Sequence, residues 1–357
     1  MSAPGFTYEA LPVRVVFGAG RVAELPTEAD RLGLDRLVVL GTPGRAEDVQ
    51  LVSTLLGHRV AGHFEDARTH VPASVVQAAC EKVGRLGADG CVAIGGGSVI
   101  GLGKVVARQT GLPVIAVPTT YSGSEMTPIW GITEDGRKRT GRDLRVLPRS
   151  VVYDPELTVR LPPRVTGLSG LNAIAHAMEA LYAPDASPVT SLMAEEGIRA
   201  LAAALPVLAD EPSDLPARTL ALRGSWLCGL CLGQTTMSLH HKLCHILGGT
   251  FDLPHAETHS ILMPYVAAFN LPAAPAANEA MSRALGVAAP AVELAHLGAR
   301  TGAAPSLGEL GIAESDIDEV VRQVFSQPYA NPRRLRPDEV HGLLLAALRG
   351  TPPQSPG

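Results

Sequence analysis

The first half of the chain alternates short aliphatic runs with longer stretches in which apolar side chains recur every three to four positions. Leu37–Leu40 is an uninterrupted aliphatic run that ends at a glycine, and Gly90–Ile94 and Pro113–Val117 are similar. Between the first two runs, Ala73–Leu86 gathers its aliphatic side chains on one face of a helix. Continuous apolar strands that alternate with helices are typical of a parallel sheet, so this pattern predicts an α/β domain.

The pattern changes after the third strand. Ile129–Thr140, with Asp135-Gly136 in its middle, predicts a β-hairpin, because Asp-Gly favours a tight two-residue turn. Prolines then mark a connection, and helical periodicity replaces strand alternation. We therefore expect an α/β domain over residues 1–160 and an α-helical domain over residues 161–357.

Composition narrows the possible functions. The net charge of -5 argues against a nucleic-acid-binding surface, which needs a concentrated basic face. No apolar run approaches the length of a membrane span, and no basic, apolar leader follows Met1. We therefore expect a cytoplasmic protein with neither a nucleic-acid nor a membrane partner.

The five cysteines do not predict a disulfide framework, because their number is odd and their spacing irregular. Cys228 and Cys231 form a C-x-x-C pair, which in other proteins serves redox chemistry or binds a metal. Here the pair lies in an apolar, helical run with no second pair to complete a zinc site, so we expect a buried structural role.

Gly95-Gly96-Gly97-Ser98 lies between a predicted strand and a predicted helix. Glycines let the backbone approach a pyrophosphate closely, and the helix N-terminus offers N–H groups and a favourable dipole. A glycine run also forms ordinary tight turns, and this one lacks the G-x-G-x-x-G spacing of common dinucleotide-binding domains. Its place directly after a buried strand favours a phosphate-binding loop.

A second loop, Pro118–Pro128, follows the next predicted strand and is rich in hydroxyl groups. Its side chains can donate hydrogen bonds to a phosphate or to a nicotinamide carboxamide. The alternative is a solvated turn in which serine and threonine cap a helix. The residues of the loop alone leave both interpretations open.

Histidines cluster in the second half of the chain. Asn172 and His176 lie four positions apart on an otherwise apolar helix, as do His241 and His245. Five of the eleven histidines lie within the 20 residues 240–259. A lone histidine on an apolar helix is usually a core residue, but packing does not account for such a density, which favours an active site.

Together these motifs resemble those of the iron-containing alcohol dehydrogenases, which have a G-G-G-S turn, a P-T-T-x-x-x-S-E loop and a helical domain that carries metal ligands. The likeness runs from Val16–Gly20 to the Leu-Pro-His255 region and beyond. It implies the dehydroquinate synthase-like fold of that family, with an α/β N-terminal dinucleotide-binding domain and an all-α C-terminal catalytic domain. It also implies a homodimer.

Within that superfamily the chain resembles the maleylacetate reductases. The resemblance rests on Thr69–Pro72, Lys138–Arg142, Asn172–His176 and above all the long stretch His240–His259. It implies reduction of the C=C bond of 2-maleylacetate to 3-oxoadipate, with NADH or NADPH as the reductant, in the degradation of aromatic compounds.

Metal-dependent relatives bind their ion through one aspartate and three histidines, and the matching positions here are Asn172, His176, His241 and His255. A neutral amide is a poor replacement for a carboxylate on a hard divalent ion. The substitution at Asn172 is the pattern of the maleylacetate reductases, so we expect no metal requirement.

The resemblance assigns cofactor binding to residues of the two loops and the hairpin, namely Gly96, Gly97, Ser98, Thr119, Thr120, Ser124 and Lys138. Thr42, just beyond the first predicted strand, would face the adenosine ribose. Relatives restricted to NAD often carry an aspartate there, and this chain has none. NADPH is therefore not repelled, and either cofactor is expected.

Hydride addition to a C=C bond conjugated with a ketone leaves an enolate, which needs a hydrogen-bonding partner and a proton. We expect His241 and His245 to stabilise the enolate and donate the proton, in an order that stays open. His176, His255 and Asn172 would complete the pocket.

Because the expected substrate is a dicarboxylate, Lys242 and Arg142 are candidate cationic partners, although either can equally be a solvated surface charge. Three rival functions remain. A metal-dependent alcohol dehydrogenase conflicts with Asn172, and a catalytically silent nucleotide-binding protein conflicts with the histidine cluster. A biosynthetic reductase of another enone or ketone stays open.

Overall fold

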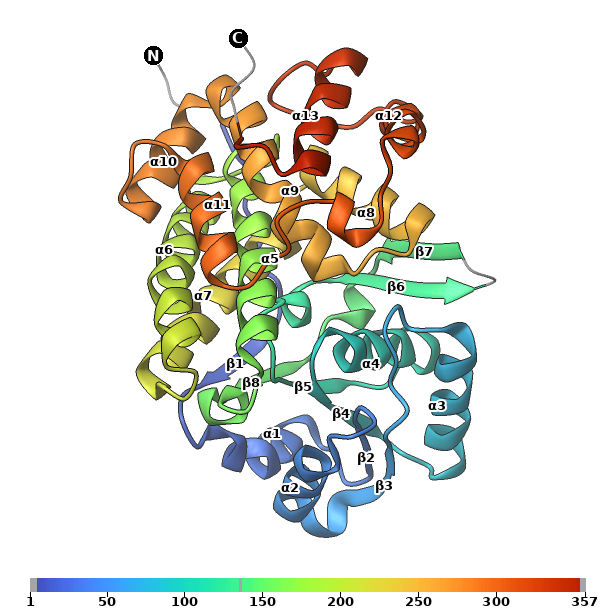
Figure 1. Cartoon of the computed structure of the whole chain (residues 1–357). Coiled ribbons are helices and arrows are strands. Elements are labelled where there is room, and N and C mark those ends of the chain that lie inside the picture. Colours follow the sequence, from blue (N-terminus) through green and yellow to red (C-terminus); the bar gives the residue numbers. More distant parts are fainter. Residues whose placement is uncertain (1–4, 135–136, 354–357) are drawn as a thin grey trace. The chain divides into compact units, whose positions relative to one another are not determined.

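The structure is a computed structural model that describes residues 5–134 and 137–353 (Figure 1). The chain forms two compact units. One spans Leu11–Leu161, and the other comprises the chain from Pro162 onward together with the segment that ends at Ala10. None of the described helices is both long enough and apolar enough to cross a lipid bilayer.

The first unit is built on a parallel sheet. Its six strands are β1 (Arg14–Phe17), β2 (Leu37–Leu40), β3 (Val60–Phe64), β4 (Gly90–Gly95), β5 (Val114–Pro118) and β8 (Ser150–Tyr153). The order across the sheet is β1-β8-β5-β4-β2-β3. The helices of this unit are α1 (Leu25–Leu32), α2 (Ala46–Leu56), α3 (Ala73–Arg85) and α4 (Gly97–Thr110). The three strands and the helix predicted from aliphatic patterning are β2, β4, β5 and α3, and the α/β class is confirmed.

The strand order reverses between β2 and β4. From β2 the chain passes through α2 to β3 at one edge, whereas from β4 it passes through α4 to β5 in the opposite direction. Right-handed crossovers in opposite directions put α2 and α4 on opposite faces of the sheet, which makes the carboxyl ends of β2 and β4 a topological switch point. Ligands of open α/β sheets bind at this kind of switch point.

The predicted hairpin is present as an antiparallel pair, β6 (Ile129–Glu134) and β7 (Arg137–Arg142), in which Ile129 lies opposite Arg142. Its expected turn, Asp135-Gly136, lies outside the described residues. The two strands form a separate sheet within the α/β unit.

The second unit is helical, with no strand among its described residues. It contains α5 (Pro163–Leu181), α6 (Pro188–Asp210), α7 (Leu215–Gln234), α8 (Leu239–Phe251), α9 (His255–Asn270), α10 (Pro275–Leu285), α11 (Pro290–Arg300), α12 (Ile317–Val324) and α13 (Pro337–Arg349). Helix α5 is buried from Thr166 to Ala180 and packs against α6, α7 and α9. Its central position explains why its sequence lacks a polar face and why its few polar side chains matter.

The C-x-x-C pair lies in α7, where Cys228 and Cys231 are fully buried. A Cβ on Gly197 of α6 would come within 2.7 Å of the Cys228 sulfur, so the glycine permits close packing of the two helices. Burial raises the pKa of both thiols, and the pair serves packing, as expected.

Candidate active site

The glycine loop joins β4 to α4 at the carboxyl edge of the sheet. Gly95 ends β4 with φ near 145°, a conformation that residues with side chains rarely adopt. A Cβ on Gly96 would come within 2.9 Å of the Thr120 side chain, whereas a Cβ on Gly97 would meet no atom closer than 3.7 Å. Gly97 is exposed and begins α4, whose first N–H groups have no partners within the helix. The loop is therefore a cradle that fits a pyrophosphate.

The hydroxyl-rich loop lies beside this cradle. The Thr119 N–H donates to the Gly95 carbonyl over 3.0 Å. The buried Lys104 of α4 donates through Nζ to the Ser124 carbonyl at 2.7 Å and to Thr127 Oγ1 at 2.8 Å. Burial lowers the pKa of this lysine to about 7. Thr120 and Ser124 remain partly exposed, so they stay accessible to a ligand. The hydrogen bonds from Lys104 hold their loop in place.

Thr42 joins the same edge of the sheet. It follows β2, which pairs with β4, and its Oγ1 lies 3.4 Å from the place that a Cβ on Gly95 would take. Lys138 lies on β7 of the hairpin, opposite Thr133, and is exposed. The structure thus gathers Thr42 and both loops at the switch point, while Lys138 belongs to the separate two-stranded sheet.

Three helices of the second unit bring the histidines together. The contributions are Asn172 and His176 from α5, His240, His241 and His245 from α8, and His255 and His259 from α9. The ring centres of His176 and His241 lie 4.9 Å apart, and those of His255 and His259 lie 4.3 Å apart. The rings of His241 and His259 link the two groups at 5.0 Å. The predicted convergence of the histidines is therefore present in the described structure.

A carboxylate from α5 joins this cluster. His241 Nδ1 lies 2.7 Å from Glu179 Oε2, and His241 Nε2 lies 2.8 Å from His176 Nδ1. Glu179 is fully buried, and burial alone would raise its pKa. Hydrogen bonds from the His241 ring and from the Ser238 backbone N–H outweigh burial and hold the pKa of Glu179 below its ordinary value, so the carboxylate stays ionised.

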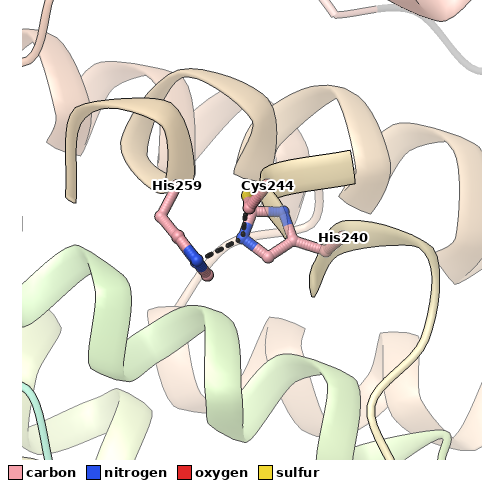
Figure 2. A group of neighbouring side chains, drawn as sticks. All are labelled: His240, Cys244 and His259. Atoms are coloured by element: carbon pink, nitrogen blue, oxygen red, sulfur yellow. Dashed lines mark hydrogen bonds between the residues drawn. The ribbon is translucent and has the colours of Figure 1, made fainter. Parts of the chain in front are cut away.

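His240, Cys244 and His259 form a buried group within the cluster (Figure 2). His240 Nε2 lies 3.0 Å from His259 Nδ1 and 3.7 Å from the Cys244 sulfur. Burial lowers the pKa of His240 to about 3 and the pKa of His259 well below its usual range, so both rings are neutral. Burial also raises the pKa of the Cys244 thiol. The ligand atoms of these three residues lie within 4.8 Å of one another, which makes them a possible ligand group for a soft ion.

The remaining candidates lie nearer the surface. His245 is exposed and His255, at the start of α9, is half-buried, with their ring centres 6.3 Å apart. The Lys242 ammonium lies 5.8 Å from the centre of the Tyr329 ring. Arg142 is exposed at the end of β7, in the α/β unit. Lys242 is thus a neighbour of the histidines in sequence and in its helix, whereas Arg142 belongs to the other unit.

Comparison with known proteins identifies the family. The sequence profile described as iron-containing alcohol dehydrogenase matches residues 12–155, and that of the Fe-containing alcohol dehydrogenase family, C-terminal, matches residues 166–348. The chain belongs to the iron-containing alcohol dehydrogenase family. This membership confirms the resemblance found in the two loops and in the histidine stretch.

Some relatives within the family are similar along their whole length. Maleylacetate reductase of Burkholderia cepacia is 51% identical over 348 residues, which cover 98% of this chain and 99% of that protein. The crystal structures of maleylacetate reductase from Agrobacterium tumefaciens and from a Rhizobium species each have a TM-score of 0.95 and 46% identity, and each comparison covers 98% of this chain and 100% of the other.

The family name implies an ion at the positions of Asn172, His176, His241 and His255. The donors present in this chain do not fit a divalent ion well. The amide of Asn172 brings no charge to offset that of the ion, although its buried oxygen, which has no hydrogen-bond partner among the described residues, is open to a donor or an ion. His176 Nδ1 and His241 Nε2 face each other across a hydrogen bond, which occupies both nitrogens.

Sequence reasoning missed Glu179. It lies three positions after His176 and seven after Asn172, on the same face of α5, and that spacing marks all three as neighbours. A glutamate in an otherwise apolar helix was the available indication. His240 and His259 were counted in the histidine cluster, but the sequence does not separate them from the partly exposed members.

Proposed function

We propose that this protein reduces the C=C bond of 2-maleylacetate to 3-oxoadipate with NADH or NADPH, in the degradation of aromatic compounds. The observation that carries the proposal is the similarity to maleylacetate reductases along the whole chain, at 51% identity to the Burkholderia cepacia protein. The amide at position 172 and the histidine cluster support it, because both suit proton transfer better than metal-assisted alcohol oxidation. The homodimer and the cytoplasmic location stay predictions.

The cofactor would be held at the switch point of the α/β unit. Gly96, Gly97 and Ser98 offer backbone N–H groups to the pyrophosphate, and Thr120 and Ser124 offer partly exposed hydroxyls. Thr119 is buried and would serve the cofactor by joining the two loops through its N–H. We propose Lys138 as a further cofactor contact and Thr42 as the neighbour of the adenosine ribose. When bound there, a reduced nicotinamide would supply the hydride for the alkene carbon farther from the ketone.

The histidines would manage the charge and the proton that follow. Hydride addition moves the π electrons toward the ketone, and the resulting enolate oxygen needs a hydrogen-bond donor. The alkene carbon beside the ketone then takes a proton, which completes the reduction. We propose His241 and His245 for these two tasks, with His176, His255 and Asn172 around them. His245 is exposed, so it can regain its proton from water after each turnover.

The two substrate carboxylates call for cations. We propose Lys242 for one of them, because it lies on α8 with His241 and His245. Arg142 is the second candidate, on its membership of the hairpin motif. Both assignments rest on the proposed substrate.

The function is tested by following the oxidation of NADH and NADPH with maleylacetate, with other enones and ketones, and by the reverse assay with simple primary alcohols. We expect turnover of maleylacetate with 3-oxoadipate as the product. Turnover of a primary alcohol, with none of maleylacetate, would overturn the proposal. Preference for another enone would retain the reductase chemistry and reject the named substrate.

We predict that activity does not depend on a bound divalent metal. Prolonged treatment with EDTA is expected to leave the wild-type rate unchanged, because the donor set lacks the family carboxylate. Asn172→Asp restores that carboxylate on the same helical face as His176, and it should bind Zn²⁺ or Fe²⁺ at least about tenfold more tightly, a gain of ~1.4 kcal/mol.

The matched control is Asn278→Asp on α10, which adds the same charge on a helix that carries none of the clustered histidines. Metal content and activity are measured on all three proteins after identical dialysis. Inactivation of the wild type by EDTA, reversed by added metal, contradicts the prediction. Equal metal affinity of the Asn172→Asp and Asn278→Asp variants shows that the histidines do not converge on one ion.

A further inference from the structure

We infer that Glu179 is a positioning residue of the active site, which acts by fixing the nitrogen of His241 that carries the proton. Hydrogen bonds join Glu179 to His241 and His241 to His176, and each of them has a defined direction. The role of Glu179 in turnover rests on the proposed function, whereas the direction of the hydrogen bonds is a property of the protein without substrate.

The surroundings of Glu179 leave its carboxylate only one way to bond. Oε2 accepts the backbone N–H of Ser238 at 2.9 Å, and Oε1 accepts the backbone N–H of His240 at 2.8 Å. Oε2 also accepts the backbone N–H of His241 at 3.4 Å, and the Tyr182 hydroxyl donates a hydrogen bond to the same carboxylate. The ring atom His241 Nδ1 lies 2.7 Å from Oε2. An ionised carboxylate is an acceptor only, so His241 must place its hydrogen on Nδ1.

The direction of the second hydrogen bond, between His241 and His176, follows from that constraint. With its hydrogen on Nδ1, neutral His241 has a bare Nε2, which can only accept. His176 Nδ1, 2.8 Å away, must then be the donor. Glu179 therefore sets the tautomers of two histidines on different helices, although it contacts only one of them directly.

The same carboxylate also caps a helix. Ser238 precedes α8, but its side chain makes no capping hydrogen bond to the helix. Glu179, from α5, accepts N–H groups at the start of α8 in its place, where the helix dipole favours a negative charge. Any test must therefore separate the positioning of His241 from the stabilisation of α8.

Fixing the tautomer matters because both nitrogens of neutral His241 are engaged, so the ring can donate to the enolate only after it takes up a proton on Nε2. The ionised Glu179 behind Nδ1 stabilises the imidazolium that forms and leaves Nε2 as the nitrogen that takes up and gives the proton. An orienting carboxylate behind a histidine holds the ring and its hydrogen where the chemistry requires them. Without Glu179, His241 can rotate or exchange its hydrogen between nitrogens, and His176 loses its defined partner. We expect Glu179→Gln to lower kcat by about 100-fold, with KM for NADH changed little, because the cofactor loops lie in the other unit.

Glutamine is an informative replacement because it has nearly the size of glutamate. In either orientation its NH₂ group meets a backbone N–H of α8, so part of the cap is lost. Glu179→Asp keeps an acceptor-only group and should recover part of the lost kcat. If the loss of kcat came from the weakened helix cap alone, kcat would instead fall in proportion to the loss in the free energy of unfolding of each variant.

A double-mutant cycle separates the two roles. Glu179→Gln, His241→Gln and the double variant are compared for kcat and for the free energy of unfolding. If Glu179 acts through His241, its replacement in the His241→Gln background changes kcat by less than about threefold. It should still destabilise the fold in that background. Full multiplication of the two kcat effects would overturn the inference and leave Glu179 as a helix cap.

The tautomer is measured directly by ¹⁵N NMR of histidine-labelled wild-type protein, with the His241 resonances assigned by their loss in His241→Gln. We expect a protonated Nδ1 and a bare Nε2. A bare Nδ1 would overturn the inference even if every Glu179 variant failed to fold. Because this measurement needs no substrate, it also distinguishes failure of the inference from failure of the proposed reaction.

Discussion

Replacing His245 with alanine is expected to lower kcat by about 100-fold or more, while the affinity for NADH stays close to that of the wild type. The reduction needs one proton from the protein in each turnover. His245 is exposed, and its ring centre lies 6.2 Å from that of His241 and 6.3 Å from that of His255. It is thus both part of the cluster and in exchange with water, which suits a group that gives up a proton and regains it.

The matched control for His245 is His296→Ala, which removes another exposed histidine from a helix of the same unit. The steady-state kcat and KM of both variants are measured with maleylacetate at saturating NADH. A His245→Ala enzyme with nearly wild-type kcat would show that another group supplies the proton. The same loss in both variants would point to a general effect on the helical unit.

Replacing Gly97 with valine is expected to raise the dissociation constant of NADH by about 100-fold or more, equivalent to ~2.7 kcal/mol. A branched side chain at the start of α4 would occupy the space through which a pyrophosphate approaches the backbone. The structure also predicts that the variant folds, because a Cβ at this position meets no atom closer than 3.7 Å.

The control for the loop is Gly84→Val on α3. Gly84 is also an exposed helical glycine of the α/β unit, and a Cβ there would have no neighbour within 4 Å. Binding is measured by calorimetry, and folding by thermal unfolding. An unchanged dissociation constant in a folded Gly97→Val protein would place the phosphate elsewhere.

Three of the six strands, β2, β4 and β5, could be predicted from the sequence, because they are continuous aliphatic runs. The strands β1, β3 and β8 were not predicted, although β8 lies inside the sheet and all four of its residues are buried. Leu37–Leu40 is β2 with the same bounds, and all four of its residues are buried. The edge strand β1 was not predicted, because only Val16 of its four residues is buried and the pattern carries little contrast. An edge strand needs fewer apolar side chains, so patterning identifies it less well.

The members of the histidine cluster could be predicted from the sequence, but the burial of each side chain could not. The spacing of His241 and His245 places both on one face of α8, and His240 and Cys244 share the same spacing one residue earlier. The structure buries His240 and exposes His245. Which of two adjacent helical faces meets the core depends on how α8 packs against α9, and a single helix does not contain that information.

The pairing of β1 with β8 carries a consequence for how the chain folds as it is synthesised. Val15 lies opposite Val151, and the Asp154 side chain accepts the N–H groups of Gly20 and Val22 at 3.2 and 3.0 Å. Strand β1 leaves the ribosome first but cannot pair until β8, the last strand of its sheet, has been synthesised more than 130 residues later. Such non-local closure slows folding and exposes an unpaired strand edge in the meantime. A polypeptide released before Ser150 would keep its glycine loop yet leave β1 without its neighbour, and we expect it to aggregate.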